Sequence, residues 1–343
     1  MRRVDIVVPV FDGYEETLSC LESVLRTLES DWARLIIVND SSPNPRIVNY
    51  VNELCTSHPE IVLLENETNM GFVATANRGM AYDIERDVLL LNSDVEVSGD
   101  WLSRLREAAY QQQDIASVTP FSNNATICSF PNFCEDNRLI SKLPLEVIDD
   151  LFSSLFCAED VFKVPTGVGC CMYMRRDCLI ETGYFDLKAF GRGYGEENDW
   201  CQRAERKGWS NLHLANCFVH HVGGVSFGDE YKTRVAHAQE ILDKKYPRYH
   251  ADVQSFIASD PARGHRVKAL LGLFATQDKP KILMISHKLG GGAQQHVEEL
   301  VHLYDDQALF LQIIPDIDGE TVRLSFFENG KRLRDVQGLL FAL

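Results

Sequence analysis

The 343-residue sequence has no hydrophobic run long enough to span a membrane as a helix. It also has no internal repeat and no low-complexity tract. The opening stretch MRRVDIVVPV contains two arginines and a short apolar run that ends at a proline, which predicts a strand rather than a signal peptide. With 45% hydrophobic and 24% charged residues, the composition is that of an ordinary globular protein.

Basic residues are few, with 34 Lys and Arg against 50 Asp and Glu and a net charge of −16. This balance argues against a protein that binds nucleic acid through a broad basic face. It does not exclude an anionic ligand, because a local site can oppose the overall sign of the charge.

No CxxC pair occurs among the ten cysteines, which disfavours a structural zinc site. The cysteines are scattered without regular spacing, and most lie in apolar runs such as VGCCMYM (168–174). Disulfide frameworks belong to small secreted proteins, so we expect reduced thiols in a cytoplasmic protein.

Apolar, β-branched runs alternate with segments of helical spacing in the first third of the chain. The expected strands are 4–10, 34–40, 61–65 and 87–94, and the expected helices are 15–30, 45–57, 72–84 and 100–112. This alternation predicts parallel βαβ units, and therefore an α/β fold with a mostly parallel central sheet flanked by helices. After about residue 113 the pattern loosens, although 142–156 predicts an amphipathic helix and 170–186 a strand followed by a short helix closed by Gly183.

In parallel sheets, ligands bind beyond the carboxyl ends of the strands. Three of the four predicted strands end in polar or acidic residues, and the four ends are Pro9-Val10-Phe11, Asn39-Asp40-Ser41, Glu65 and Asn92-Ser93-Asp94. We therefore expect a polar site along this edge of the sheet.

Two of these strand ends carry carboxylates that allow two interpretations each. Asp94 could hold a hard divalent cation together with a bound diphosphate, or it could cap the next helix. Asp40 could accept the N3–H of a pyrimidine base, or it could form an Asx-turn with the following Ser-Ser-Pro. The two interpretations of Asp40 are compatible.

Two further motifs are ambiguous on their own. NMGFVATANRGM (69–80) places Asn69 and Gly71 before a helix and Asn77 within it, which suits either a phosphate at the helix start or a simple turn with an N-cap. FVHHVGGVSFG (218–228) joins two histidines to a Gly-Gly turn, and such a pair is either structural or a source of one metal ligand.

A cluster of acids precedes a predicted helix in GYGEENDWCQRAERKGW (193–209). Glu196, Glu197 and Asp199 occupy three of four positions, with aromatic residues on both sides. One interpretation is a solvated helix N-terminus, where acids are favoured by the helix dipole. The other is a catalytic base beside an anionic substrate.

Residues 4 to about 230 resemble the family 2 nucleotide-sugar glycosyltransferases, which have the GT-A fold. The resemblance rests on motifs in the family's order and spacing: VVPVFDGYEETLSCLESV, IIVNDSS, NMGFVATANRG, LLLNSDVEV, TGYFD, GYGEENDWCQRAERKGW and HVGGVS. It implies an inverting glycosyltransferase of the hexosyltransferase type (EC 2.4) that depends on Mn²⁺ or Mg²⁺.

The resemblance also assigns the donor side of the site. Pro9, Val10 and Asp40 match positions that line the nucleobase pocket, and Asn69, Gly71 and Asn77 match the segment near the ribose and diphosphate. Asn92-Ser93-Asp94 matches the metal-binding DxD motif with Asn in place of the first Asp, which leaves one carboxylate for the metal. His221, five residues before Ser226, matches a late histidine that approaches the metal or diphosphate, and His220 is the less favoured of the pair.

The acidic motif of the family has its catalytic base at its second acid, which makes Glu197 the predicted base and Asp199 the second choice. The same resemblance implies that Glu196 contacts the acceptor. Tyr194 and Trp200 could stack on an acceptor sugar, although packing against the helix is the favoured role of Trp200.

The resemblance is to bacterial enzymes that build O-antigen, capsule or other surface polysaccharides, including rhamnosyltransferases. It implies a UDP- or dTDP-sugar donor, a saccharide or lipid-linked oligosaccharide acceptor and no nucleic acid. Asp40 does not separate the two donors, because uracil and thymine present the same N3–H.

Three other functions predict different sequence features. A catalytically degenerate scaffold module would have lost Asp94 and the acidic motif, yet both are retained. The departures are Asn92 for the first Asp of the metal motif and Glu197 for the common Asp of the acidic motif. A nucleotidyltransferase would carry a Gly-rich basic loop after its first strand, whereas PVFDGYEET (9–17) has one glycine and no basic residue. A glycoside hydrolase would use paired carboxylates without a nucleotide pocket.

The segment KPKILMISHKLGGGAQQHVEELVHLY (279–304) predicts a fresh strand, Gly-rich loop and helix that resemble the opening of family 4 GT-B glycosyltransferases. The sequence thus predicts a catalytic domain at 1–230, a helical connection at 231–278 and a partial Rossmann-like segment at 279–343. That last segment is either an accessory βα unit or, as we expect, the start of a second domain in a longer two-activity enzyme. RVKALLGLFA (266–275) could touch the inner membrane peripherally, but a packing helix explains it equally well.

Overall fold

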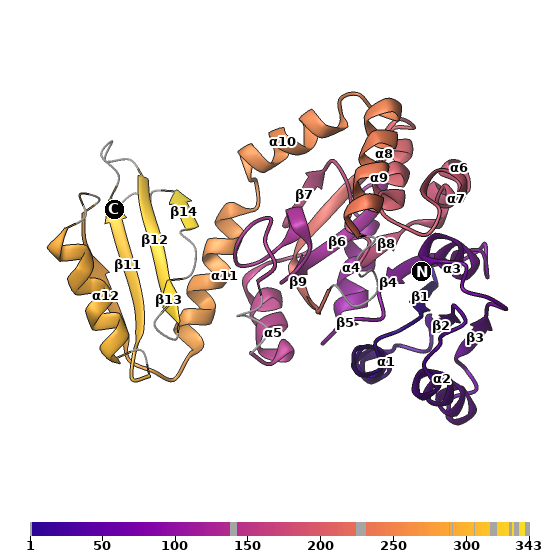
Figure 1. Ribbon diagram of the computed structural model, residues 1–343, viewed down its shortest axis with the longest axis horizontal. Helices are drawn as coiled ribbons and strands as arrows, with labels where there is room; N and C mark the ends of the chain where they lie inside the picture. Colours follow the sequence, from indigo (N-terminus) through magenta and orange to yellow (C-terminus); the bar gives the residue numbers. More distant parts are fainter. Residues whose placement is uncertain are drawn as a thin grey trace. The chain divides into compact units, whose positions relative to one another are not determined.

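The computed structural model describes residues 2–137, 143–223, 231–287, 289, 291–304, 306–315, 321–328, 331–332 and 336–339. It divides into two compact units, Met1–Asp260 and Pro261–Leu343, which are described separately (Figure 1). The division falls inside the segment that the sequence predicts as a helical connection. Ser226 of the HVGGVS motif lies outside the described residues.

The first unit begins with four parallel strands in the spatial order β3-β2-β1-β4. The strands are β1 (Val4–Val10), β2 (Ala33–Asn39), β3 (Val62–Glu65) and β4 (Asp87–Leu91). The intervening helices are α1 (Tyr14–Thr27), α2 (Pro45–Ser57) and α3 (Phe72–Met80), and α4 (Trp101–Ala109) follows β4. This alternation confirms the predicted α/β fold with helices flanking a central sheet.

The same sheet continues beyond β4 in the order β8-β6-β9-β5, with β7 also paired to β9, so its described part has nine strands. The added strands are β5 (Val95–Glu96), β6 (Ile115–Ser122), β7 (Val161–Val164), β8 (Cys171–Met174) and β9 (Ser210–His221). Of these pairings only β6 with β9 is parallel. Apart from β8, the sequence did not predict these strands.

Six α-helices and a 3-10 turn complete the described part of this unit. They are η1 (Thr126–Cys128), α5 (Leu145–Leu155), α6 (Arg176–Thr182), α7 (Leu187–Phe190), α8 (Glu196–Glu205), α9 (Tyr231–Lys245) and α10 (Tyr249–Ser259). Helix α6 ends at Gly183, as predicted, because its φ of +81° suits glycine.

Hydrophobic clusters cover both faces of the sheet, because successive side chains of a strand point to opposite sides. On β1, Ile6 and Val8 pack into one cluster with residues of α1, α2 and α4. Val7 packs into the other cluster, with residues of α3, α8 and α9. Burial of β1, β2 and β4 on both faces explains their nearly continuous apolar sequences.

The second unit is a smaller sheet with helices. It contains α11 (Arg263–Thr276), β10 (Lys281–Ile285), α12 (Gly292–Tyr304), β11 (Leu309–Pro315), β12 (Thr321–Glu328), β13 (Lys331–Arg332) and β14 (Val336–Leu339). Strands β10 and β11 are parallel, and the remaining pairs are antiparallel. Strand β10 and helix α12 lie within the predicted segment 279–304, and residues 288 and 290 of the loop between them lie outside the described residues.

Helix α11 contains RVKALLGLFA (266–275), for which the sequence allows either membrane contact or packing. Its apolar residues Val267, Leu270 and Leu273 are buried, and the helix contacts β14, as expected of a packing helix. None of the described helices combines the length and apolar character that crossing a membrane requires.

All ten cysteines lie among the described residues and are free thiols.

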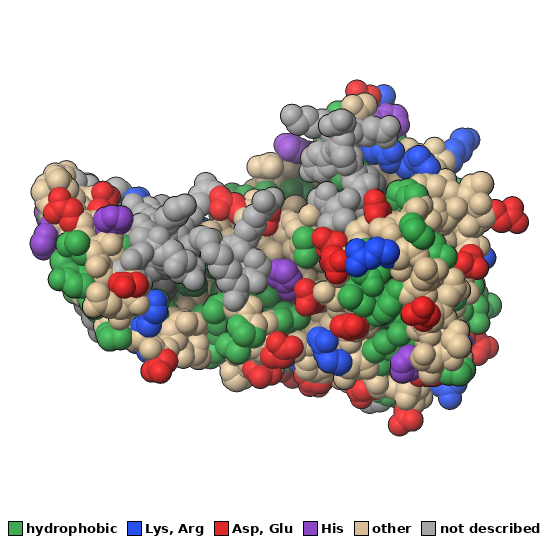
Figure 2. Space-filling view, turned by 60° about the horizontal axis from the view of Figure 1, so that its bottom comes forward, with side chains coloured by type: hydrophobic (Ala, Val, Ile, Leu, Met, Phe, Trp, Pro, Cys, Tyr) green, Lys and Arg blue, Asp and Glu red, His purple; other side chains and the backbone are tan. Residues whose placement is uncertain are grey.

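On the face of the molecule in Figure 2, acidic and basic side chains are interspersed over the described surface without a broad basic area.

Candidate active site

A cavity of about 370 Å³ lies in the first unit, where the carboxyl ends of β1, β2 and β4 meet. All but three of the predicted site residues line it: Pro9, Val10, Asp40, Asn69, Gly71, Asn92, Ser93, Asp94, Tyr194, Glu196, Glu197 and His221. The predicted edge of the sheet thus gathers residues that are far apart in the sequence.

Asp40 joins the end of β2 to the loop before α3. Its Oδ1 accepts hydrogen bonds from the side chain of Asn66 (2.7 Å) and the backbone N–H of Met70 (2.8 Å), and its Oδ2 accepts from the N–H of Gly71 (2.8 Å). The turn after β2 is instead formed by Asn39, whose Oδ1 accepts the N–H three residues later (2.9 Å). Asp40 therefore shapes the wall of the cavity rather than making the Asx-turn.

Gly71 starts α3 against the loop that carries Arg192. Its φ is +82°, and a Cβ on this residue would fall 2.9 Å from the Cα of Arg192. The Arg192 guanidinium donates to the backbone oxygen (2.9 Å) and to Oδ1 (2.6 Å) of Asn69. A side chain at residue 71 would therefore push this loop away from the cavity.

Arg192 and Arg234 also line the cavity, and neither was predicted from the sequence. The sequence contains a feature that could have pointed to Arg192, because this residue stands between two glycines immediately before the acidic motif. These glycines have φ values of +54° and +134°, so the loop adopts a backbone that most residues avoid. Arg234 lies on α9 and carried no comparable signal.

Asp94 and His221 meet because the short strand β5 pairs with the end of β9, with Val95 opposite His221. The His221 Nε2 lies 3.4 Å from Asp94 Oδ1, and the N–H of Gly223 donates to Asp94 Oδ2 (3.0 Å). Burial alone would raise the pKa of Asp94, but the hydrogen bond and charge of His221 lower it. Burial opposes protonation of His221, yet neighbouring Cys170 and Asp94 hold its pKa well above its ordinary value.

These side chains offer a divalent cation an incomplete set of ligands. Asp94 supplies a carboxylate and His221 a ring nitrogen, and the buried Oδ1 of Asn92 in the same cavity has no hydrogen-bond partner. The described residues contain no group of three or more His, Cys, Asp or Glu side chains that could hold a metal. The donor set fits a cation that takes further oxygen ligands from a bound diphosphate.

Helix α8 presents two adjacent glutamates to the cavity from its first turn, after Gly195 in the left-handed conformation. Glu196 is 5% exposed, and its Oε2 has no hydrogen-bond partner. Burial and the charge of Glu197 raise the pKa of Glu196 well above its usual range. Burial also raises the pKa of Glu197, against the opposing effect of backbone N–H groups at the helix start. The interpretation as a solvated helix N-terminus therefore does not describe Glu196.

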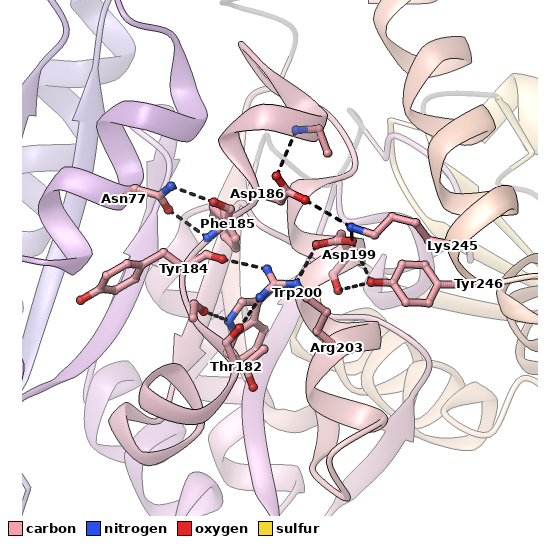
Figure 3. Close-up of polar contacts among 12 residues, drawn as sticks. Asn77, Thr182, Tyr184, Phe185, Asp186, Asp199, Trp200, Arg203, Lys245 and Tyr246 are labelled. Atoms are coloured by element: carbon pink, nitrogen blue, oxygen red, sulfur yellow. Dashed lines mark hydrogen bonds and ion pairs between the residues drawn. The ribbon is translucent and has the colours of Figure 1, made fainter.

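Asn77, Asp199 and Trp200 are the three predicted residues that do not line the cavity. Figure 3 shows their polar contacts. The Asn77 side chain donates to the backbone oxygen of Phe185 (2.9 Å) and accepts from its N–H (3.0 Å). Trp200 is fully buried and donates to the oxygen of Gly183 (2.9 Å), which agrees with its favoured packing role.

Asp199 is fully buried on the side of α8 that faces α9. Its carboxylate pairs with Arg203 on its own helix (2.8 Å) and with Lys245 at the end of α9 (2.5 Å). It also accepts a hydrogen bond from the Tyr246 hydroxyl (2.7 Å), and Figure 3 shows these partners around it. This network fixes α8 against α9, and it turns Asp199 away from any substrate in the cavity.

A protein-family model described as Glycosyl transferase family 2 matches residues 5–183, slightly more than half of the chain. Among curated proteins, uncharacterized proteins of Mycobacterium tuberculosis and Mycobacterium bovis are 25% identical over 219 residues. The alignment covers 64% of this chain and 73% of each relative.

Two solved structures share the fold, each with a TM-score of 0.52 and 13% sequence identity. One is GalNAc-T7 with UDP, GalNAc and Mn²⁺, and the match covers 76% of this chain and 51% of that chain. The other is the mannosyltransferase PcManGT from Pyrobaculum calidifontis in complex with GDP-Man and Mn²⁺, and the match covers 88% of this chain and 80% of that chain.

Proposed function

The chain belongs to glycosyl transferase family 2, and from that starting point we propose that it transfers a sugar from a UDP- or dTDP-linked donor to an acceptor hydroxyl with inversion. The observation that carries this proposal is the content of one cavity. It combines a carboxylate suited to a pyrimidine base, a partial cation site and two adjacent glutamates with raised pKa values.

The donor base and diphosphate have separate supports in the cavity. Asp40 Oδ2 accepts a single N–H bond from Gly71, so it retains a lone pair for the N3–H of uracil or thymine. Pro9 and Val10 line the cavity beside it. Arg192, tied to Asn69, places a positive charge next to the segment assigned to the diphosphate.

Asp94 and His221 would hold a divalent cation, Mn²⁺ or Mg²⁺, together with the donor diphosphate. When bound there, the cation neutralises charge that develops on the departing diphosphate oxygen, an effect of several kcal/mol in such sites. The cavity has one carboxylate at this position because Asn92 replaces the other. Binding of the cation therefore depends on the donor.

Glu197 is the base that takes the proton of the acceptor hydroxyl. Burial raises its pKa and so makes its carboxylate a stronger base than an exposed glutamate. Inversion follows when this hydroxyl attacks opposite the departing diphosphate. Glu196 and Tyr194 line the same cavity and contact the acceptor, a saccharide or a lipid-linked oligosaccharide.

We assign the protein to the synthesis of bacterial surface polysaccharide, such as O-antigen or capsule. Rhamnosyl transfer is one of the reactions to test. The resemblance of the motifs to those of bacterial enzymes that build such polymers is the support for this assignment. We place the protein in the cytoplasm, with peripheral contact at the inner membrane where a lipid-linked acceptor would be presented.

Nucleotide release from a panel of UDP- and dTDP-linked sugars, with and without Mn²⁺ and candidate acceptors, tests this function. We expect Mn²⁺-dependent release of one nucleotide that increases with the correct acceptor. Donor binding without any release in the whole panel would instead support the catalytically degenerate scaffold module.

A further inference from the structure

The turn-rich segment that follows β6 makes close contacts with the end of β9. Strand β6 pairs with β9 in parallel up to Ser122, which lies opposite Val219. Beyond that point the side chain of Asn123 takes over the pairing. Its Nδ2 donates to the backbone oxygen of His221 (2.8 Å), and its Oδ1 accepts from the His221 N–H (2.7 Å). One buried amide side chain thus holds both backbone groups of His221.

Asn123 is itself held in place. It is 2% exposed, and its backbone oxygen accepts hydrogen bonds from the N–H (2.9 Å) and the side chain (3.1 Å) of Asn137. These bonds hold the backbone from which the buried Asn123 side chain reaches His221.

The next residue, Asn124, determines which ring nitrogen of His221 carries hydrogen. Its backbone oxygen lies 2.6 Å from His221 Nδ1. A carbonyl oxygen only accepts hydrogen bonds, so Nδ1 is the donor in this contact. In the neutral ring the lone pair is then on Nε2, the nitrogen that faces Asp94.

The same segment lies directly against Gly223. A Cβ on Gly223 would fall 2.2 Å from the Nδ2 of Asn124, and the φ of Gly223 is +72°. The N–H of Gly223 donates to Asp94 Oδ2 (3.0 Å). Asn123 and Asn124 therefore contact His221 directly, and Asn124 also lies against Gly223, whose N–H donates to Asp94.

We propose that Asn123 is a positioning residue that fixes the backbone of His221 so that its Nε2 faces Asp94 and a divalent cation bound there. The inference rests on the proposed function, in which Asp94 and His221 hold that cation. Without the Asn123 amide, the backbone of His221 would lose two hydrogen bonds, while the pairing of β9 with β5 and the contact of Nδ1 with the Asn124 oxygen would remain. The direction of the ring would then be less closely fixed. Partners that orient a metal-binding histidine commonly change metal affinity when they are removed.

The test compares N123A with N211A as a matched control. Asn211 is buried near the other end of β9, and its side chain also makes two hydrogen bonds, at 2.8 and 3.4 Å. Mn²⁺ is titrated into each protein alone and with saturating UDP or dTDP, and thermal unfolding is recorded in parallel. We expect N123A to bind Mn²⁺ about 10- to 100-fold more weakly in the nucleotide complex. N211A should unfold at a lower temperature but bind Mn²⁺ as the wild type does.

A near-isosteric variant keeps the test decisive if N123A does not fold. N123D retains an oxygen that accepts from the His221 N–H but cannot donate to the His221 carbonyl as a carboxylate. We expect it to weaken Mn²⁺ binding as well. Wild-type Mn²⁺ affinity in whichever of these variants folds would overturn the inference.

H221A separates failure of this inference from failure of the proposed function. If Asn123 acts through His221, adding N123A to H221A should cause no further loss of Mn²⁺ affinity. A further loss of the same size would overturn the positioning role while leaving His221 as a ligand. Wild-type Mn²⁺ binding by H221A itself would overturn the cation site of the proposed function.

Discussion

Glu196 and Glu197 are neighbours in the sequence, yet they are expected to behave differently in the reaction. Glu196 has a buried oxygen without a partner and a pKa raised well above its usual range, so a neutral glutamine can replace it. Glu197 is the proposed base, and glutamine cannot accept a proton. We expect E197Q to lower kcat by about 10²- to 10⁴-fold and to leave donor binding intact. E196Q should retain most of the turnover.

Steady-state kinetics with the identified acceptor measure this difference, and each variant controls for the other. Retained turnover in E197Q would remove Glu197 as the base. A loss in E196Q as large as in E197Q would show that Glu196 acts as a carboxylate.

The raised pKa of Glu197 predicts the acid side of the pH profile. A base works only when deprotonated, and burial raises the pKa at which Glu197 gains its proton. As the pH is lowered, turnover should therefore begin to fall at a pH higher than about 4.3, the pKa of an exposed glutamate. The dependence of kcat/KM on pH measures this. A profile that stays flat down to that pH would contradict a raised pKa of Glu197.

Two acid–histidine pairs lie side by side where β5 meets β9, and they provide a matched test of the cation site. Asp94 and His221 line the cavity, whereas Glu96 and His220, 3.7 Å apart, do not. We expect D94A to abolish the gain in nucleotide affinity that Mn²⁺ provides, because it removes the only carboxylate assigned to the cation. E96A should keep that gain. Calorimetry of both variants checks the prediction, and equal behaviour would contradict it.

Individual site residues could be predicted where a motif placed a functional side chain directly after a strand or at a helix start. Asp40, Asp94 and Glu197 are such residues, and all three line the cavity. Asp199 could not be separated from Glu197 in this way, because the two residues are neighbours along the chain but face different directions on a helix. Arg192 was missed because its position depends on a loop backbone that the sequence does not define.

Among the elements, the first four strands and their helices follow from local periodicity. The strand expected at 87–94 ends at Leu91, because Asn92–Asp94 form a turn that leads into β5. Strands β6, β7 and β9 were not predicted, since β9 pairs with β6 across 94 to 97 positions and with β7 across 47 to 53 positions. The meeting of Asp94 with His221 depends on β9 and therefore required the structure.

The contact between α8 and α9 depends on Asp199. Its charge meets Arg203 and Lys245, which are 23% and 34% exposed, so part of the interaction is screened by water. We expect D199N to lower the free energy of unfolding by about 2 kcal/mol while keeping kcat near that of the wild type.

Denaturant unfolding and kinetics of the same preparation measure both quantities for D199N. D177N is the control, because the Asp177 carboxylate is itself 36% exposed where it pairs with Arg2 and Arg175, and its loss should cost less than about 1 kcal/mol. A large loss of kcat in D199N without a loss of stability would make Asp199, the second choice from sequence, the base.

In the whole molecule, every residue that lines the cavity belongs to the unit Met1–Asp260. The proposed donor, cation and acceptor sites therefore all belong to this unit. The unit Pro261–Leu343 has a sheet of its own and its own small hydrophobic cluster around Val301 and Phe310. Its resemblance to the start of a family 4 enzyme stays a prediction.

The proposed function requires that the cavity bind a pyrimidine nucleotide together with a divalent cation. Calorimetric titration of the whole protein with UDP and with dTDP, each with and without Mn²⁺, measures this most directly. We predict that one of the nucleotides binds and that Mn²⁺ strengthens its binding, because Asp94 and His221 provide only part of the cation's ligands. Absence of binding by both nucleotides in the presence of Mn²⁺ would overturn the proposed nucleotide and cation sites.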